Sequence, residues 1–363
     1  MACVLKEPKA KKRKIINFNI LLNKLPIDIK IKIINYRILS NYKCSTLEAH
    51  NGAVNCILIH NDCIISAGND KMIKVWDFKN KKLKKVLKGH LTSILCLKSY
   101  KKYIISSSLS NIIMIWDLNK SLYIRKINVS NEYLLYEKTL KFSIIGENII
   151  SIFQGRRRNA NGWIERLKNF TQFWNINTGE TKRFIRSTQE ENKLYYIHTI
   201  ITFGNNFIVF PNCSLIEIWD IKINQQIKLL QGHTEDIFTL NIKENLLISG
   251  SKDNTIKLWN LKTCQCLKTY NGHTDSVNSV IFHKKFIVSG SKDKTIKLWN
   301  INTTECLKTF LNGHSFDVTC ILSYKDNIIS ASYDNTIKIW EEEKEIDTYK
   351  RFLKIKIPKK KMK

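Results

Sequence analysis

One spacing constrains the fold of this chain more than any other feature of its sequence. Five segments begin at a Gly-His or Ala-His pair, and in each a tryptophan follows the histidine 26 residues later. The histidines are His50, His90, His233, His273 and His314, and the tryptophans are Trp76, Trp116, Trp259, Trp299 and Trp340. A constant interval of this kind predicts repeated units that bury their hydrophobic faces by stacking against one another.

Two further positions recur inside these units. A serine occupies the same offset in all five, at Ser66, Ser106, Ser249, Ser289 and Ser330. An aspartate follows in four of them, at Asp70, Asp253, Asp293 and Asp334, whereas the second unit has Ser110. The intervening stretches, such as FIVSGS and TIKLWN, are rich in β-branched residues and are bounded by turn-forming residues. The pattern therefore predicts short β-strands.

The segment GHTDSVNSVIFHKKFIVSGSKDKTIKLWN resembles a WD repeat, in which one copy forms a four-stranded propeller blade. The resemblance implies a structural hydrogen-bond network in each unit, in which the aspartate holds the histidine and the histidine reaches the serine and the indole N–H. Polar groups are tolerated inside an apolar blade when they satisfy one another in this way.

Two weaker units fill the gap between the second and third histidines. One, TLKFSIIGENIISIFQG with NFTQFWN, ends at Trp174, and the other, IHTIITFGNNFIVF with LIEIWD, ends at Trp219. Neither has the Gly-His pair or the aspartate, so we expect both to depend on apolar packing. KCSTLEAH, which ends at His50, resembles CLKTYNGH before His273, and we expect it to complete the last blade. The sequence thus predicts one all-β domain over residues 42–340, a seven-bladed WD-repeat β-propeller.

Residues 1–41 and 341–363 do not fit the repeat. The segment PKAKKRK, from Pro8 to Lys14, resembles a nuclear import signal, and PKKKMK forms a second basic cluster at the other end. Solvated basic tails are an equally suitable interpretation. We expect the protein in the nucleus or the cytoplasm, because neither a secretory signal nor an apolar run long enough to span a membrane is evident.

Part of the N-terminal region has a helical pattern. Ile29, Ile33 and Ile34 fit one helical face, and Pro26 suits a helix start. The beginning of an F-box, which docks a substrate receptor onto a ubiquitin ligase adaptor, is similar to Leu25, Pro26, Asp28, Ile29, Ile33 and Ile34. The first propeller strand begins near Tyr42, so most of an F-box is missing and a generic helix is the alternative. The compact repeats also resemble those of F-box/WD-repeat substrate receptors.

The third unit contains about 13 extra residues between Ser151 and Trp174, in GRRRNANGWIERLK. In WD-repeat propellers such a loop emerges on the upper face, where partners usually bind. The basic residues expected there are Arg156, Arg157, Arg158, Arg166 and Lys168.

F-box receptors hold phosphorylated peptides with arginines at two upper-face positions of their blades. The position just before the turn aspartate holds Lys252 and Lys292 here, but Asn69 and Tyr333 in two other units. The position five residues after the histidine has no basic residue, since it holds Asn55, Leu95, Phe238, Asn278 and Thr319. Lysine lacks the bidentate geometry of arginine. We hypothesise that Lys252, Lys292 and the three loop arginines form a positive rim for an acidic or phosphorylated segment, with Tyr333 and Asn278 on the same face.

Charge and cysteine content add weaker constraints. A net charge of +29 favours acidic partners through long-range attraction, although lysine, asparagine and isoleucine are abundant throughout, so compositional bias is the alternative. The ten cysteines form no CxxC pair and no zinc-type cluster, so we expect reduced thiols that mostly fill the core. Cys56, Cys96 and Cys320 share one strand position. No metal or cofactor is predicted.

Catalytic motifs are not evident. The sequence has no phosphate-binding loop, no nucleophile elbow and no HExxH helix. His233 and Glu235 form an H-x-E triplet, but the cysteine pair of the zinc deaminases does not accompany it. We therefore expect no enzyme but a scaffold that recognises acidic or phosphorylated proteins, with a ubiquitin ligase receptor as the specific hypothesis. The alternative is a nuclear or nucleolar assembly factor for ribonucleoprotein particles, whose basic tails contact RNA.

Overall fold

The repeated units form sheets in the computed structural model, which describes residues 42–129, 141–158, 164–185, 198–310 and 313–342. Side chains are described in these ranges except at 152–170 and 183–185. The chain divides into two units, Met1–Asn41 and Tyr42–Lys363, and all described strands belong to the second. Every helix or strand within the described ranges is a β-strand, and the strands make seven four-stranded sheets. The predicted seven blades are confirmed, whereas the predicted N-terminal helix lies outside the described residues.

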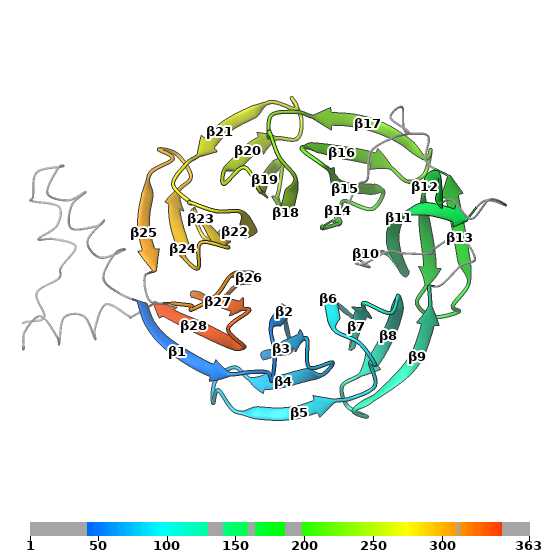
Figure 1. Ribbon diagram of the computed structural model, residues 1–363, viewed down its shortest axis with the longest axis horizontal. Coiled ribbons are helices and arrows are strands. Elements are labelled where there is room, and N and C mark those ends of the chain that lie inside the picture. The colour runs from blue at the N-terminus through cyan, green and yellow to red at the C-terminus, as the bar shows by residue number, and fades with distance from the viewer. Residues whose placement is uncertain (1–41, 130–140, 159–163, 186–197, 311–312, 343–363) are drawn as a thin grey trace, which may run out of the picture. The chain divides into compact units, whose positions relative to one another are not determined.

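Blades are numbered in chain order, and within each the first strand is innermost and the fourth outermost (Figure 1). Blade 1 contains β2 (Val54–His60), β3 (Cys63–Gly68), β4 (Ile73–Asp77) and β5 (Leu83–Leu87). Blade 2 contains β6 (Ile94–Tyr100), β7 (Tyr103–Ser108), β8 (Ile112–Asp117) and β9 (Leu122–Asn128). Blade 3 contains β10 (Phe142–Ile145), β11 (Asn148–Arg158), β12 (Ile164–Asn175) and β13 (Thr181–Ile185). Blade 4 contains β14 (Ile201–Phe203), β15 (Phe207–Asn212), β16 (Leu215–Asp220) and β17 (Gln225–Leu230).

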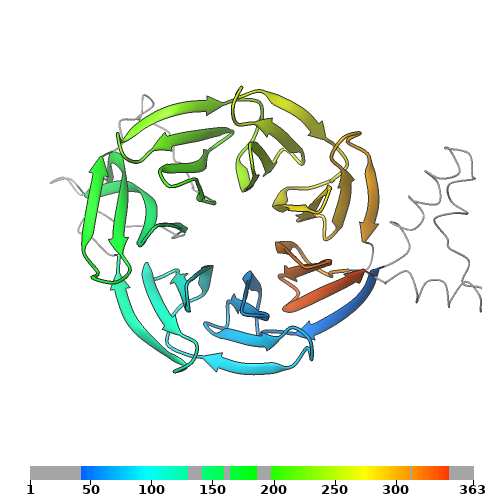
Figure 2. The same cartoon turned by 180° about the vertical axis from the view of Figure 1, so that it is seen from behind.

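The remaining blades follow the same order of strands. Blade 5 contains β18 (Ile237–Lys243), β19 (Leu246–Ser251), β20 (Ile256–Asn260) and β21 (Cys266–Tyr270). Blade 6 contains β22 (Val277–His283), β23 (Phe286–Ser291), β24 (Ile296–Asn300) and β25 (Cys306–Phe310). Blade 7 contains β26 (Val318–Tyr324), β27 (Asn327–Ser332), β28 (Thr336–Glu342) and, from the N-terminal side of the propeller, β1 (Tyr42–Glu48). Seen from either side, the seven sheets of residues 42–342 surround a common axis (Figure 2).

The two ends of the propeller meet in blade 7. Strand β1 pairs antiparallel with β28, and Cys44 lies opposite Trp340. The prediction that KCSTLEAH supplies the outer strand of the last blade is therefore confirmed. A hydrophobic cluster that contains Leu47, Trp76 and Ile339 then joins blade 7 to blade 1. Closure of this kind leaves no blade face open to solvent at the join.

The core lies between neighbouring blades because the strands are buried on both faces. In β23, for example, Ile287 and Val288 are both fully buried. Strands buried in this way require nearly continuous apolar runs instead of strict alternation. The side chains of Leu87 and Trp116 belong to one cluster that spans blades 1 and 2, and similar clusters join most other neighbours.

The cysteines occupy two kinds of position. Cys56 and Cys96 are buried on inner strands, as expected for core residues. The prediction that the cysteines mostly fill the core is wrong for Cys44, Cys266 and Cys306, which are exposed. All three lie on outermost strands, where alternate side chains face solvent.

Candidate functional site

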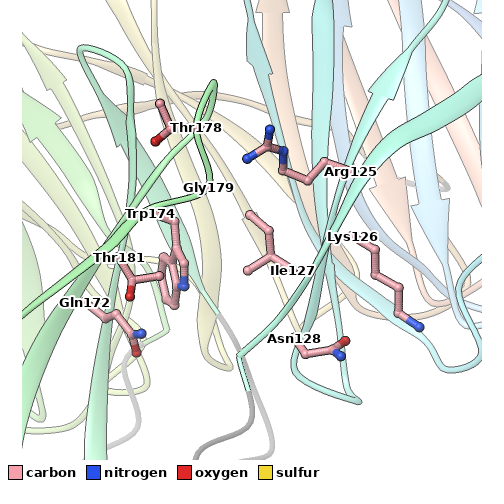
Figure 3. Close-up of a pocket in the computed structure, with 9 residues that line it drawn as sticks. All are labelled: Arg125, Lys126, Ile127, Asn128, Gln172, Trp174, Thr178, Gly179 and Thr181. Carbon is pink, nitrogen blue, oxygen red and sulfur yellow. The ribbon is translucent and has the colours of Figure 1, made fainter.

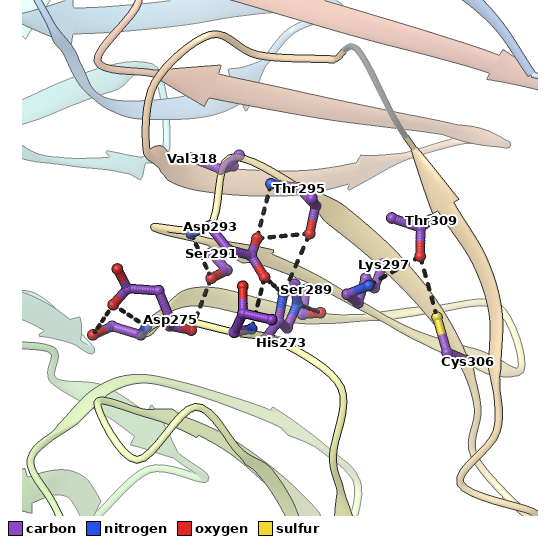
Figure 4. Close-up of polar contacts among 12 residues, drawn as sticks. His273, Asp275, Ser289, Ser291, Asp293, Thr295, Lys297, Cys306, Thr309 and Val318 are labelled. Carbon is purple, nitrogen blue, oxygen red and sulfur yellow. Dashed lines mark hydrogen bonds and ion pairs between the residues drawn. The ribbon is translucent and has the colours of Figure 1, made fainter.

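Blade 6 shows how the repeated polar residues are joined (Figure 4). Trp299 Nε1 donates a hydrogen bond to Ser289 Oγ at 2.8 Å, and this oxygen lies 2.7 Å from His273 Nε2. On the other side of the imidazole, Nδ1 lies 2.6 Å from Asp293 Oδ2. A carboxylate can only accept, so Nδ1 carries the proton, and in the neutral imidazole the unprotonated Nε2 accepts from the serine hydroxyl. A neutral imidazole therefore satisfies all three contacts.

The same network recurs in blades 1, 5 and 7. The His–Ser distances are 2.7, 2.7 and 2.8 Å, and the Trp–Ser distances are 2.9, 2.8 and 3.0 Å. The His–Asp distances are 2.8, 2.6 and 2.8 Å. The residues are His50, Ser66, Asp70 and Trp76 in blade 1, His233, Ser249, Asp253 and Trp259 in blade 5, and His314, Ser330, Asp334 and Trp340 in blade 7. Each network holds the loop before the first strand against the turn between the second and third strands.

The aspartates of blades 5, 6 and 7 are held in the ionised form. Partial burial opposes ionisation, but hydrogen bonds from the histidine and from a neighbouring threonine outweigh it, so the pKa values of Asp253, Asp293 and Asp334 lie below the usual range. Asp253 Oδ2 also accepts from the backbone N–H of Thr234 at 3.2 Å. The carboxylate thus fixes the backbone of the adjacent loop as well as the histidine.

Blade 2 has an incomplete network. His90 Nε2 lies 2.7 Å from Ser106 Oγ, and Trp116 Nε1 donates to the same oxygen at 2.7 Å. Ser110 replaces the aspartate, and the buried Nδ1 of His90 has no hydrogen-bond partner among the described residues. Burial, with a contribution from the charge of Lys126, lowers the pKa of His90 to about 4.

Blade 4 satisfies its tryptophan in a different way. Trp219 Nε1 donates to Glu217 Oε2 at 2.6 Å, and Asn212 Nδ2 donates to the other carboxylate oxygen at 2.6 Å. Glu217 is only 3% exposed and lies opposite Phe210, which replaces the serine of other blades. Blade 4 therefore has a polar contact in addition to the expected apolar packing, because the acceptor has moved to the neighbouring strand.

We call the upper face the surface formed by the loop before the first strand and by the turn between the second and third strands of each blade. The predicted binding residues Lys252 and Lys292 lie in such turns, with side chains that are 53% and 55% exposed. Lys252 Nζ lies 3.1 Å from Glu235 Oε2, and Lys292 Nζ lies 3.9 Å from Asp275 Oδ2. The loop before the first strand of the same blade thus partly neutralises each lysine.

Two other predicted residues differ in their accessibility. Tyr333 is 51% exposed in the corresponding turn of blade 7. The side chain of Asn278 instead donates from Nδ2 to the Val318 carbonyl at 3.1 Å, and so joins blade 6 to blade 7. Asn278 therefore has a structural contact that the sequence did not indicate.

The extra residues of blade 3 lie between β11 and β12, where the spacing placed them. They lengthen both strands, so that Arg156 lies opposite Arg166 and Arg158 lies opposite Ile164. Most of the segment expected as a loop therefore belongs to paired strands, since β11 extends to Arg158 and β12 begins at Ile164. The structure does not describe the side chains of Arg156, Arg157, Arg158, Arg166 and Lys168, and Leu25, Pro26, Asp28, Ile29, Ile33 and Ile34 lie outside the described residues.

Sequence reasoning missed several exposed apolar residues of the upper face. Phe316 is 57% exposed beside Tyr333 in blade 7, and blade 2 exposes Leu91 and Leu109 to 73% and 41%. The available signal was their position in the repeat, since Leu91 and Phe316 follow the network histidines His90 and His314, and Leu109 precedes Ser110 in the turn. Together they make this part of the upper face apolar and aromatic.

Neither a metal centre nor a membrane span is found in the described part of the chain. Among those residues, no group of three or more His, Cys, Asp or Glu side chains is arranged to hold a metal ion. No helix there is long and apolar enough to cross a membrane.

Comparisons with known proteins agree with this architecture. The family model described as "WD domain, G-beta repeat" matches residues 41–77, 81–117, 224–260, 264–300 and 304–341, just over half of the chain. Among solved structures, the computationally designed Ika8 protein is similar, with 22% identity and a TM-score of 0.60 over 81% of this chain and 98% of the other. At that identity the likeness shows the fold alone. The search of curated proteins found no match.

Proposed function

The chain belongs to the WD40 (G-beta) repeat family, whose propellers generally serve as protein-interaction scaffolds, and we propose that its upper face binds a partner protein. The observation that carries this proposal is the exposure of Phe316 and Tyr333 in blade 7 and of Leu91 and Leu109 in blade 2. Large apolar side chains held in water on a rigid surface are typical of binding sites, and aromatic residues often supply much of the binding energy.

Blade 1 lies between these two groups and presents amides. Asn55 Nδ2 donates to Asn69 Oδ1 at 2.9 Å and to the carbonyl of Ile94 at 2.8 Å. Asn69 is exposed and retains hydrogen-bonding capacity toward a ligand. Aromatic anchors flanking an amide-rich centre suit a peptide segment that combines apolar side chains with an accessible backbone.

We propose further that the partner is acidic or phosphorylated where it reaches blades 5 and 6. The support is the half-exposed pair Lys252 and Lys292. A phosphate group carries nearly two negative charges and three acceptor oxygens, so it can compete with Glu235 and Asp275 for these ammonium groups. Because Glu235 and Asp275 already pair with these lysines, a single carboxylate of a partner would gain little binding energy there. A phosphorylated segment is therefore the better ligand than one that is only acidic.

The test is affinity purification of the tagged full-length protein, with cross-linking mass spectrometry of the recovered partner. Replacing Phe316 and Tyr333 together by alanine should weaken binding at least tenfold, as should Lys252→Glu combined with Lys292→Glu for a phosphorylated partner. Leu267→Ala is the matched control, because Leu267 is a 45% exposed apolar residue on the outer strand β21. Unchanged binding by both upper-face variants would refute the proposal.

The specific role as a ubiquitin ligase receptor rests on the F-box-like residues within 1–41. If the role is correct, cullin-adaptor subunits are recovered with the full chain and lost from a variant without residues 1–41. Recovery of ribonucleoprotein precursors, with binding that weakens steeply as salt rises, would instead favour the assembly-factor alternative.

A further inference from the structure

A groove on the outer rim separates blade 2 from blade 3 (Figure 3). Its volume is about 500 Å³. Arg125 and Ile127 point into it from β9, and Gln172, Trp174 and Thr181 face them from blade 3, whereas Lys126 points to the other side of β9 (Figure 3). The groove is distinct from the upper-face residues discussed above.

At this groove the outer strand of blade 2 is less completely buried than the outer strands of blades 1, 4, 5, 6 and 7 are at the same register position. Ile127 of β9 is only partly buried. It lies opposite Ile113, which is three residues before Trp116, the tryptophan of blade 2. The residues at the same register position of other blades are 1–7% exposed, namely Leu47, Leu87, Leu230, Tyr270 and Phe310. Water therefore reaches an apolar side chain where the repeat normally excludes it.

One sequence departure in blade 3 leaves more room at this interface. Gln172, two residues before Trp174, stands where four other blades have the longer lysine, namely Lys74, Lys257, Lys297 and Lys338. Blade 2 has Met114 at this position.

One buried polar group at the inner wall of the groove lacks a partner in the described part of the chain. Gln172 is only 7% exposed, and its Oε1 has no hydrogen-bond partner among the described residues. A buried acceptor without a donor is unfavourable, so a ligand that donates a hydrogen bond there would be stabilised. The groove therefore selects for a donor at its inner wall.

The opposite end of the groove is positively charged. Arg125 Nη2 donates to the Asn177 carbonyl at 2.6 Å, which holds the guanidinium at the rim and leaves N–H groups directed to the groove. A Cβ at position 179 would lie 2.3 Å from Arg125 Nη1, so Gly179, with φ of 80°, makes room for this arrangement. A carboxylate is the complementary group for such a fixed guanidinium.

We propose that this groove binds an extended acidic segment of a partner protein. A backbone N–H of the segment donates to Gln172 Oε1, an apolar side chain covers Ile127, and a carboxylate pairs with Arg125. A protein segment fits better than a small molecule because the groove is open and polar, whereas small-molecule sites are mostly enclosed and apolar.

The adjoining surface of β9 supports the same occupant. Leu122 and Ile124 of this strand are 64% and 49% exposed, so β9 carries further exposed apolar side chains, whereas the ring of Tyr123 packs edge-on against Trp116. Strand β9 is also the outermost strand of its sheet, so a partner segment can add to its edge through backbone hydrogen bonds. Apolar contacts with β9 would add to the affinity for an extended segment, and backbone pairing with the strand edge would fix the direction in which the segment runs.

The probe for the test is a phage-displayed library of random heptapeptides selected on the immobilised full-length protein. Enriched peptides should carry Asp or Glu, and their dissociation constants are then measured by fluorescence polarisation. Gln172→Met, which supplies the residue type of blade 2 and removes the unpartnered acceptor oxygen, should weaken binding at least tenfold while the protein melts at an unchanged or higher temperature. Arg125→Gln should weaken binding at least tenfold as well.

Lys85→Gln is the matched control, because Lys85 makes the equivalent contact from blade 1, to the Leu118 carbonyl, and does not line this groove. Peptides without an acidic residue, or peptides whose affinity survives both groove variants, would overturn the proposal. Two competitors distinguish other occupants. Glutarate that binds as tightly as the peptides would identify a small-anion site, and a peptide of residues 130–140 that displaces every hit would identify the chain's own sequence as the ligand.

Discussion

Lys85 Nζ donates a hydrogen bond to the carbonyl oxygen of Leu118 at 2.6 Å and so joins the outer strand of blade 1 to a turn of blade 2. The same contact recurs between Arg125 and Asn177 at 2.6 Å, Lys228 and Leu261 at 2.5 Å, and Lys268 and Ile301 at 3.1 Å. Each cation lies opposite the residue that precedes its blade's tryptophan. Part of the large positive charge therefore has a structural use between blades.

Replacing Lys85 by methionine should lower the free energy of unfolding by about 1 kcal/mol, because the Leu118 carbonyl loses a charged donor while the packing of the side-chain stem is kept. Urea denaturation measures the change. Lys79→Met removes an exposed lysine from a turn of the same blade and should change stability by less than about 0.5 kcal/mol. Equal effects of the two substitutions would contradict the structural role of Lys85.

Ser110→Asp should complete the network of blade 2. The new carboxylate would accept a hydrogen bond from His90 Nδ1, as Asp70 does from His50 at 2.8 Å. We expect the free energy of unfolding to rise by about 1 kcal/mol and the pKa of His90 to rise from about 4. Chemical denaturation and an NMR titration of the imidazole measure the two effects. A less stable variant would show that the turn of blade 2 cannot bring a carboxylate to the histidine.

Stability should fall as the pH decreases from about 6.5 to about 4. Burial lowers the pKa values of His90 and His198 from 6.5 to about 4. Between these two pH values the two histidines are therefore protonated in the unfolded chain but neutral in the folded chain. Each histidine contributes at most on the order of 3 kcal/mol to the loss. Urea midpoints measured in steps between pH 7 and pH 4 test this, and Ser110→Asp should reduce the slope. A midpoint that rises toward pH 4 would contradict the account.

Asp253, Asp293 and Asp334 act at lower pH. Their pKa values are depressed in the folded state, so the stability they provide is present above the ordinary carboxyl pKa and is lost as the pH falls below it. The acid transition should therefore continue below pH 4, after the histidine phase.

Glu217→Ala should destabilise the protein by about 2 kcal/mol, because it removes the carboxylate that accepts hydrogen bonds from Trp219 and Asn212 inside blade 4. Glu217→Gln keeps one acceptor oxygen of the same size and should cost less. Thermal and urea unfolding of the two variants compare them directly. If alanine is tolerated as well as glutamine, the carboxylate is not what holds the Trp219 indole.

The sequence predicted those features that depend on spacing within one blade. His273, Ser289 and Trp299 recur at fixed intervals because their contacts run across adjacent strands of one sheet, so register alone brings them together. The closing strand was predictable for the same reason, since Tyr42–Glu48 repeats the outer-strand pattern. Blade 3 and blade 4 were located from their tryptophans, although they lack the histidine.

Contacts that depend on the identity of a neighbour could not be predicted in this way. In blade 4 the acceptor for the tryptophan N–H is Glu217 on the third strand, whereas in other blades it is a serine on the second strand. The repeat spacing therefore gave no sign of this acceptor. The ion pair of Lys252 with Glu235 forms across two loops of one blade, and it changes the charge that the lysine alone suggested. The groove at Gln172 arises from a shorter side chain whose effect appears only when blade 2 is packed against blade 3.

The most direct test of the central claim, that the upper face holds a partner protein, is hydrogen–deuterium exchange of the full chain with and without its purified partner. We predict that binding slows exchange in the loops around Phe316 and Leu91 and in the turns around Tyr333 and Lys252. Slowed exchange confined to the opposite ends of the blades, such as the turn at Lys284 and Lys285, would contradict the claim.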